Sequence, residues 1–172
     1  MIASVLGAVL GNLFIVFFLI AVIVAAVKAR RRSARGRELA DILWRELVFY
    51  AVGLNFVWYA TLHAYFGTLT SKFIGWQPSS YEWELAWAEY GIAAVALLSM
   101  WSGAQMRLAA TVAFAVFSLG AAAQHIHEIL CCANNNPGNA GPILWFGDIA
   151  LPLVIFALAA VSRLQVASRR VA

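Results

Sequence analysis

Residues 108–128 read LAATVAFAVFSLGAAAQHIHE, an apolar run that ends in the polar group Gln124-His125-Ile126-His127-Glu128. No charged residue interrupts the chain from Leu108 to His127, and a run of about 20 such residues is long enough for a helix that spans a membrane. Hydrocarbon penalises ionisable side chains that lack partners, so histidines and a glutamate at one end of such a helix indicate a polar site. This stretch therefore predicts a membrane protein with a site near one surface.

The composition of the whole chain agrees with a membrane protein. Of its 172 residues, 63% are hydrophobic and only 12% are charged, which is more apolar surface than a single soluble domain buries. Four further runs lack charged residues: Met1–Val27, Leu47–Ser71, Tyr90–Met106 and Ile149–Ser162. We therefore predict an all-α polytopic membrane protein with five transmembrane helices, an anchor helix plus a four-helix bundle.

Three regions follow from these runs. We expect an N-terminal transmembrane anchor at residues 1–28, a basic cytoplasmic loop and helix start at 29–46, and the four-helix transmembrane bundle at 47–172. Residues 1–12 lack the basic start of a signal peptide, so we expect the first segment to remain in the mature protein.

The basic residues predict how the chain is oriented. With five spans, eleven of the twelve Lys and Arg residues fall on one side of the membrane, and only Lys72 falls on the other. The positive-inside rule then places the N-terminus outside and the C-terminus in the cytoplasm, in the inner membrane of a prokaryote. The net charge of +4 thus reflects topology. The expected partners are the lipid bilayer and other membrane subunits, and no nucleic acid.

One face of the second helix is polar. Asn55, Tyr59 and His63 recur every four residues, so they share a face that we expect to point toward other helices or a cavity. Ordinary hydrogen bonds between helices are the alternative role for Asn55 and Tyr59.

Acidic residues start the third helix. Glu82 and Glu84 suit a helix N-terminus electrostatically, but Glu89 lies more than a turn deeper, where this explanation does not apply. We expect the tryptophans at this end to join an aromatic belt at the membrane surface. They are Trp76, Trp83 and Trp87.

Asp148 lies in or at the edge of the hydrocarbon. The uncharged run that follows it, residues 149–162, spans roughly 21 Å as a helix, against a hydrocarbon thickness of about 30 Å. Pro152 lacks the N–H that would normally bond the carbonyl of Asp148, so we expect a kink and a free carbonyl beside this acid.

The end of the fourth helix offers two histidines and two cysteines. His125 and His127 are about 200° apart around a helix, so only one can face inward, and His125 shares its side with Glu128. Cys131 and Cys132 are adjacent, and a disulfide between neighbours requires strained local geometry. We therefore expect two small, half-buried residues without a metal or redox motif, with a reactive thiol as the alternative.

The candidate ligand-binding residues come from four helices and lie in the predicted outer half of the membrane, and we expect no comparable cluster in the cytoplasmic half. They are Asn55, Tyr59, His63, Glu84, Glu89, His125, Glu128 and Asp148. Four of these have side chains that suit zinc, iron or manganese. These metal candidates are His63, His125, Glu84 and Asp148.

Three motifs carry a resemblance to a known family. They are His125-Ile126-x-Glu128, Pro137-Gly138-Asn139-Ala140-Gly141 and Asp148-Ile149-x-x-Pro152. With them, the segment from His63 to Pro152 resembles an uncharacterised family of multi-pass membrane proteins, a domain of unknown function, in which Asn stands at the position of Glu89. A looser pattern, Glu84 with Gly91 and Arg107-Leu108-Ala109, is similar to DoxX-like four-helix proteins. That similarity implies an association with membrane redox or quinone-linked complexes.

Three functions remain open from the sequence. The first is an outward-facing polar pocket that binds a small ligand or cofactor of unknown identity, in a protein that serves as an accessory subunit. The second is a metal-dependent membrane oxidoreductase or other enzyme, although the HExxH and paired ExxH patterns are absent. The third is a purely structural helix-packing subunit. The sequence favours a binding protein over an enzyme.

Overall fold

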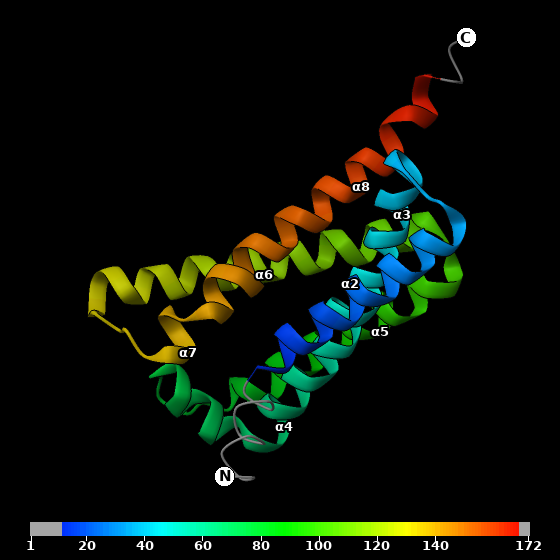
Figure 1. Cartoon of the computed structure of the whole chain (residues 1–172). Coiled ribbons are helices and arrows are strands. Elements are labelled where there is room, and N and C mark those ends of the chain that lie inside the picture. Colours follow the sequence, from blue (N-terminus) through cyan, green and yellow to red (C-terminus); the bar gives the residue numbers. More distant parts are fainter. Residues whose placement is uncertain (1–11, 169–172) are drawn as a thin grey trace, which may run out of the picture.

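The computed structural model describes residues 12–168, and their side chains through Ser162. Every regular element in this part of the chain is helical, and no strand occurs there. Five helices are long and apolar enough to cross a membrane: Leu13–Arg32, Gly36–Ile74, Tyr81–Ser102, Ala104–Cys132 and Pro137–Ser162. The predicted all-α fold with five spanning helices is therefore confirmed (Figure 1).

Helix α2 (Leu13–Arg32) is the first described helix, and its two sides differ. Its buried side carries small residues such as Ala21 and Ala25, which let the neighbouring helices approach closely. The opposite side exposes an apolar stripe made of Ile15, Leu19 and Ile23. An exposed stripe of this kind suits contact with lipid. Of the predicted first segment, residues 1–11 lie outside the described part.

The basic stretch between the first two spans is mostly helical. Helix α2 continues through Arg32, and α3 (Gly36–Glu46) begins after a turn at residues 33–35, where Ser33 has a φ of 52°. Most of the stretch that we predict as a basic loop and helix start, residues 29–46, is therefore helical, and only residues 33–35 form a turn.

The second span is a kinked rod of three segments. Helix α3 runs into a π-helix, η1 (Leu47–Leu54), and then into α4 (Asn55–Ile74). Within α4, Phe66 has a non-helical φ of −129° and ψ of 25°. The wider π-helical turns change the direction of the side chains that follow, and such turns are frequent at functional sites. The rod ends at Gly75, whose φ of 89° is a left-handed conformation that glycine adopts freely.

Helices α5 (Tyr81–Ser102) and α6 (Ala104–Cys132) form an antiparallel pair. Gly103, with a φ of 88°, is the only residue between them. Residues 75–80 connect α4 to α5. The short loop holds the last turns of α4 beside the first turns of α5.

The fifth span starts with a helical turn, α7 (Pro137–Ala140), and continues as a second π-helix, η2 (Ile143–Ala150), and as α8 (Leu151–Ser168). Asp148 lies within η2, four residues before the buried Pro152 of α8. The sequence predicts a kink here because proline cannot donate a backbone hydrogen bond. The structure has a π-helix in place of regular α-helical turns directly before the proline.

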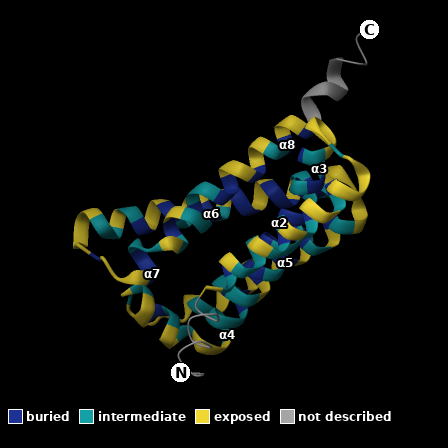
Figure 2. Cartoon of the chain, in the orientation of Figure 1, coloured by how far each residue is buried: buried dark blue, intermediate teal, exposed yellow. Residues whose placement is uncertain are grey.

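The core of the bundle is aromatic and aliphatic. Phe56 packs edge to face against Phe114, with ring centroids 5.5 Å apart, and against Phe117. Trp44, Val48 and further buried residues extend this cluster toward the end of the bundle that contains the α2–α3 turn. Figure 2 shows buried residues where the helices face each other and exposed ones on their outer sides.

The two ends of the bundle differ in chemistry. We call the end with the α2–α3 turn and Gly103 the basic end, and the end with the α4–α5 and α6–α7 loops the histidine end. The described side chains of Lys28 and Arg107 lie near the basic end, and those of His63 and His125 near the histidine end. All candidate site residues except Asn55 and Tyr59 lie within a few turns of the histidine end.

Candidate functional site

His63 links the two helices that form one side of the histidine end. Its Nδ1 donates a hydrogen bond to Glu82 Oε2 at 2.6 Å, and its Nε2 lies 3.9 Å from Glu89 Oε1. The hydroxyl of Ser71, two turns further along α4, donates to the other oxygen of Glu82. Glu82 and Glu89 are seven residues apart on α5, so both reach the same side of that helix. The imidazole thus stands between two carboxyl groups.

Glu89 is a buried acid with incomplete hydrogen bonding. Its Oε2 is buried and accepts no hydrogen bond from the residues that the structure describes. Asp148, on η2, is also buried, and together with Glu82 it lies within electrostatic range of Glu89. Two acidic side chains of α5 therefore flank His63, and Asp148 from the fifth span lies near the deeper of the two, Glu89.

The predicted polar face of α4 leads inward from His63. Asn55 and Tyr59 lie two turns and one turn below the histidine, and Tyr59 is within electrostatic range of Asp148 and Glu89. The Asn55 Oδ1 and the Tyr59 hydroxyl are buried on neighbouring side chains, and neither atom makes a hydrogen bond of good geometry with the side chains described through Ser162. Hydrogen-bonding capacity is thus unused at Asn55 and Tyr59, the two residues of this face below His63, which is unusual for buried polar atoms.

A surface pocket of about 570 Å³ opens beside His63. His63 and Glu82 both line it, and so do Lys72 and the aromatic side chains of Tyr65 and Trp83. The two aromatic rings meet edge to face at 6.5 Å. The His63–Glu82 pair therefore separates an open pocket from the buried acids.

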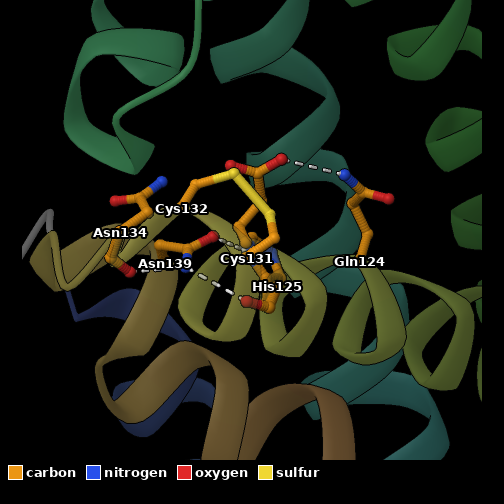
Figure 3. Close-up of a disulfide and its surroundings, with 7 residues drawn as sticks. Gln124, His125, Cys131, Cys132, Asn134 and Asn139 are labelled. Carbon is orange, nitrogen blue, oxygen red and sulfur yellow. Dashed lines mark hydrogen bonds between the residues drawn. A yellow bond between two sulfur atoms is a disulfide. The ribbon is translucent and has the colours of Figure 1, made fainter.

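His125 belongs to a different network, in which its contacts are structural (Figure 3). Asn139 donates from Nδ2 to the carbonyls of His125, at 3.2 Å, and Asn134, at 2.9 Å. This fixes the amide orientation, so Asn139 Oδ1 accepts from His125 Nδ1 at 2.7 Å, and His125 carries a proton on Nδ1. Trp76 stacks on the same ring, with centroids 5.2 Å apart. The network joins α6, α7 and the α4–α5 loop.

The structure separates the remaining candidates from His63. In the described part of the chain, no hydrogen bond or ion pair joins His125 to Glu128 or to His63. Glu84 and His127 are both exposed. The four candidate metal ligands are therefore not assembled into one site, and the predicted contact between His125 and Glu128 is not formed.

Two expectations about this end are wrong. Trp76 is half-buried against His125 and does not join an exposed belt, whereas Trp83 and Trp87 are exposed. Cys131 and Cys132 are joined in a disulfide, and both are exposed rather than half-buried. Both cysteines lie in the last turn of α6, directly before the left-handed Ala133.

A second polar network lies at the basic end, where we expect none. Lys28 Nζ pairs with the buried Glu46 at 2.7 Å, and Arg107 Nη1 pairs with Asp41 at 2.8 Å. The Arg107 guanidinium also lies 4.8 Å from the ring centroid of Trp44. Sequence reasoning missed these pairs because it assigned the charged residues of α3 to the cytoplasm, without partners in the bundle.

Glu82, Ser71, Asn139 and Asn134 are the contact residues that sequence reasoning also missed. The favourable electrostatics of an acid at a helix N-terminus already explain Glu82. Its position in the sequence therefore gives no reason to expect a bond to His63. Asn139 is buried. Its place in the Pro-Gly-Asn-Ala-Gly motif is the one sequence signal that points to it.

Comparison with known proteins supports the family resemblance and extends it. A family of unknown function, DUF6790, matches residues 11–168, a longer segment than the one on which the resemblance rests. No curated protein and no solved structure matches the chain significantly. The similarity to DoxX-like proteins stays a prediction. The chain belongs to DUF6790, a family whose function is unknown.

Proposed function

We propose that this membrane protein binds a small ligand at an outward-facing polar site formed by His63, Glu82 and Glu89. The observation that carries the proposal is the position of His63, which pairs with Glu82 in the wall of the open pocket and faces the buried Glu89 on its other side. An ionisable group that is buried among membrane helices with unfilled hydrogen bonds is costly, and such groups mark binding or transport sites.

The chemistry of the site favours a ligand that carries positive charge or hydrogen-bond donors, such as a small amine. The unfilled groups include the carboxyl oxygen of Glu89 and the amide oxygen of Asn55, both of which accept hydrogen bonds. Asp148 adds a further carboxyl group within electrostatic range. Tyr65 and Trp83 supply aromatic faces at the entrance, and such faces attract cations.

The size of the pocket fits this class of ligand. At about 570 Å³ it lies within the range of about 300 to 1,000 Å³ that is usual for small-molecule sites. Lys72 also lines the pocket, and we assign it to the outer part, because its side chain is exposed. The ligand would then enter past Tyr65 and Trp83 and meet the acidic groups beyond His63.

We also propose how the protein is oriented in its membrane. The basic end faces the cytoplasm in the inner membrane of a prokaryote, so the pocket opens to the outside. The protein acts as an accessory subunit that presents this ligand to a larger membrane complex. Among the alternatives, a purely structural role suits His125, whose ring is fully packed, better than it suits His63.

Mass spectrometry of the purified protein tests the proposal. The wild-type protein is extracted from its native membrane in mild detergent, and small molecules released on denaturation are quantified. We expect a stoichiometric small molecule with the wild type and with Glu84→Gln, which changes an exposed acid on the same helix, and its loss with Glu89→Gln and His63→Ala. Equal recovery from all four proteins, or no bound molecule in the folded wild type, would contradict the proposal.

A further inference from the structure

The disulfide at the end of α6 has no evident role in bracing the fold. Cys131 and Cys132 are the last two residues of the helix, and their Sγ atoms are bonded to each other (Figure 3). A disulfide stabilises a protein mainly by closing a loop, and the effect grows with the length of that loop. A bond between neighbours closes almost no loop, so its stabilising effect is small. Both residues are exposed to reagents.

A carboxylate lies next to the two sulfur atoms. Glu128 precedes Cys131 by three residues and Cys132 by four, so a helix brings its side chain to both. One carboxylate oxygen of Glu128 and the two sulfur atoms all lie within 4.8 Å of one another. Gln124 Nε2 donates a hydrogen bond to Glu128 Oε1 at 3.3 Å, which orients the carboxylate from one turn below.

We infer that the reduced cysteine pair and Glu128 bind a thiophilic divalent cation such as zinc or cadmium, and that disulfide formation abolishes this site. Zinc takes thiolate ligands at about 2.3 Å and carboxylate ligands at about 2.0–2.2 Å, which places two thiolates about 3.8 Å apart in a tetrahedral site. The carboxylate oxygen and both sulfur atoms already lie within 4.8 Å of one another, which is close enough for the three side chains to share one cation once the Sγ–Sγ bond is broken. A water molecule completes the four ligands, because the helix end is exposed.

The redox step balances with a thiol or dithiol reductant. Reduction breaks the Sγ–Sγ bond, the two sulfurs take up two electrons and two protons, and a dithiol reductant becomes a disulfide. Metal binding then releases both thiol protons to water, because thiolates are the metal ligands. Reoxidation by a disulfide oxidant forms the Sγ–Sγ bond again and releases the cation, while the oxidant takes up the two electrons and two protons and becomes two thiols.

This site is separate from the pocket beside His63. None of its three ligands lines that pocket, and in the described residues none contacts His63 or Glu89. The inference therefore stands or falls independently of the proposed function.

Cadmium titration of the full-length protein in detergent provides the test. One sample is reduced with a phosphine, which takes oxygen from water as the disulfide becomes two thiols, and is kept without oxygen. The other sample stays oxidised. Thiolate-to-cadmium charge-transfer absorption reports the bond, and elemental analysis after desalting reports the stoichiometry of cadmium and of zinc.

We expect one equivalent of cadmium on the reduced wild type and none on the oxidised protein. Replacing both cysteines by serine should abolish the absorption, and Glu128→Gln should weaken binding at least tenfold. Glu84→Gln, an exposed acid at the same end of the bundle, is the matched control and should bind as the wild type does. Circular dichroism confirms that each variant is folded.

Three results would overturn the inference. The metal site is wrong if the reduced wild type retains no more metal than the double serine variant. The role of Glu128 is wrong if Glu128→Gln binds with unchanged affinity. The redox control is wrong if alkylation finds two free thiols in the protein as purified in air, or if the oxidised sample binds cadmium as tightly as the reduced one.

Discussion

Replacing Asn139 by alanine should destabilise the protein substantially, although the residue lies in the short helical turn α7. The change removes three hydrogen bonds: the one accepted from His125 Nδ1 and the two donated to backbone carbonyls. Hydrogen bonds between membrane helices contribute about 0.6 kcal/mol on average, and buried ones in soluble proteins about 1 kcal/mol. Three of them give about 2 to 3 kcal/mol, a shift of the unfolding equilibrium by roughly thirty- to over a hundredfold.

Asn135 provides a matched control for this experiment. It lies four residues earlier in the chain, is exposed, and its side chain donates a single hydrogen bond, to the Ala133 carbonyl. We expect Asn135→Ala to change the free energy of unfolding by less than about 0.5 kcal/mol. Reversible unfolding by sodium dodecyl sulfate in mixed micelles, followed by circular dichroism, measures both variants.

A double-mutant cycle with His125→Ala then isolates the contact between the two side chains. Because the residues share a hydrogen bond, the double variant should lose about 0.5 to 1 kcal/mol less than the sum of the single losses. If Asn139→Ala destabilises the protein no more than Asn135→Ala does, or if the cycle shows strict additivity, the proposed tie between α6 and α7 is refuted.

Three further substitutions test the packing of the bundle by the same unfolding measurement. A Cβ on Gly138 would lie 2.6 Å from Phe73 Cδ1 and 2.8 Å from its backbone oxygen, so Gly138→Ala should cost about 1 to 3 kcal/mol. Gly147→Ala, whose Cβ meets no atom within 4 Å, should be close to neutral, and equal effects would contradict this packing. Lys28→Met leaves the buried Glu46 without its cation and should cost about 1 to 3 kcal/mol. Arg30→Met, at an exposed residue, should leave the free energy of unfolding nearly unchanged. If Lys28→Met costs no more than Arg30→Met, the pairing of Lys28 with Glu46 is disproved. Thr111→Val removes the acceptor of the buried Trp44 indole N–H, 2.9 Å away, and should cost about 1 to 2 kcal/mol. Ser102→Ala, at an exposed helix end, is its control, and similar losses for both would show that the Trp44 bond is not formed.

The helices of this fold are predictable because they follow from apolar runs and their lengths. A run such as Leu108–His127 has no stable alternative in hydrocarbon, where each backbone group must be bonded within its own helix. The shared face of Asn55, Tyr59 and His63 is predictable for the same reason, since four-residue spacing is a property of a single helix.

Contacts between different helices cannot be predicted from the spacing of residues along a single helix. The bond between His63 and Glu82 requires the short connection at residues 75–80, which holds α4 and α5 in one register. The separation of His125 from His63 depends on α7, which brings Asn139 back to α6. The π-helices η1 and η2 change the direction of the residues after them, and no periodicity argument that assumes 3.6 residues per turn predicts this shift.

The proposed ligand site depends most on whether a non-protein molecule contacts His63 and Glu89. The most direct measurement is an experimental structure of the protein extracted from its native membrane, together with the Glu89→Gln variant. The proposal predicts density in the pocket that reaches His63 Nε2 and the carboxyl group of Glu89, and the loss of that density in the variant. A pocket that contains only lipid chains, with the Glu89 carboxyl group hydrogen-bonded to protein side chains, would contradict it.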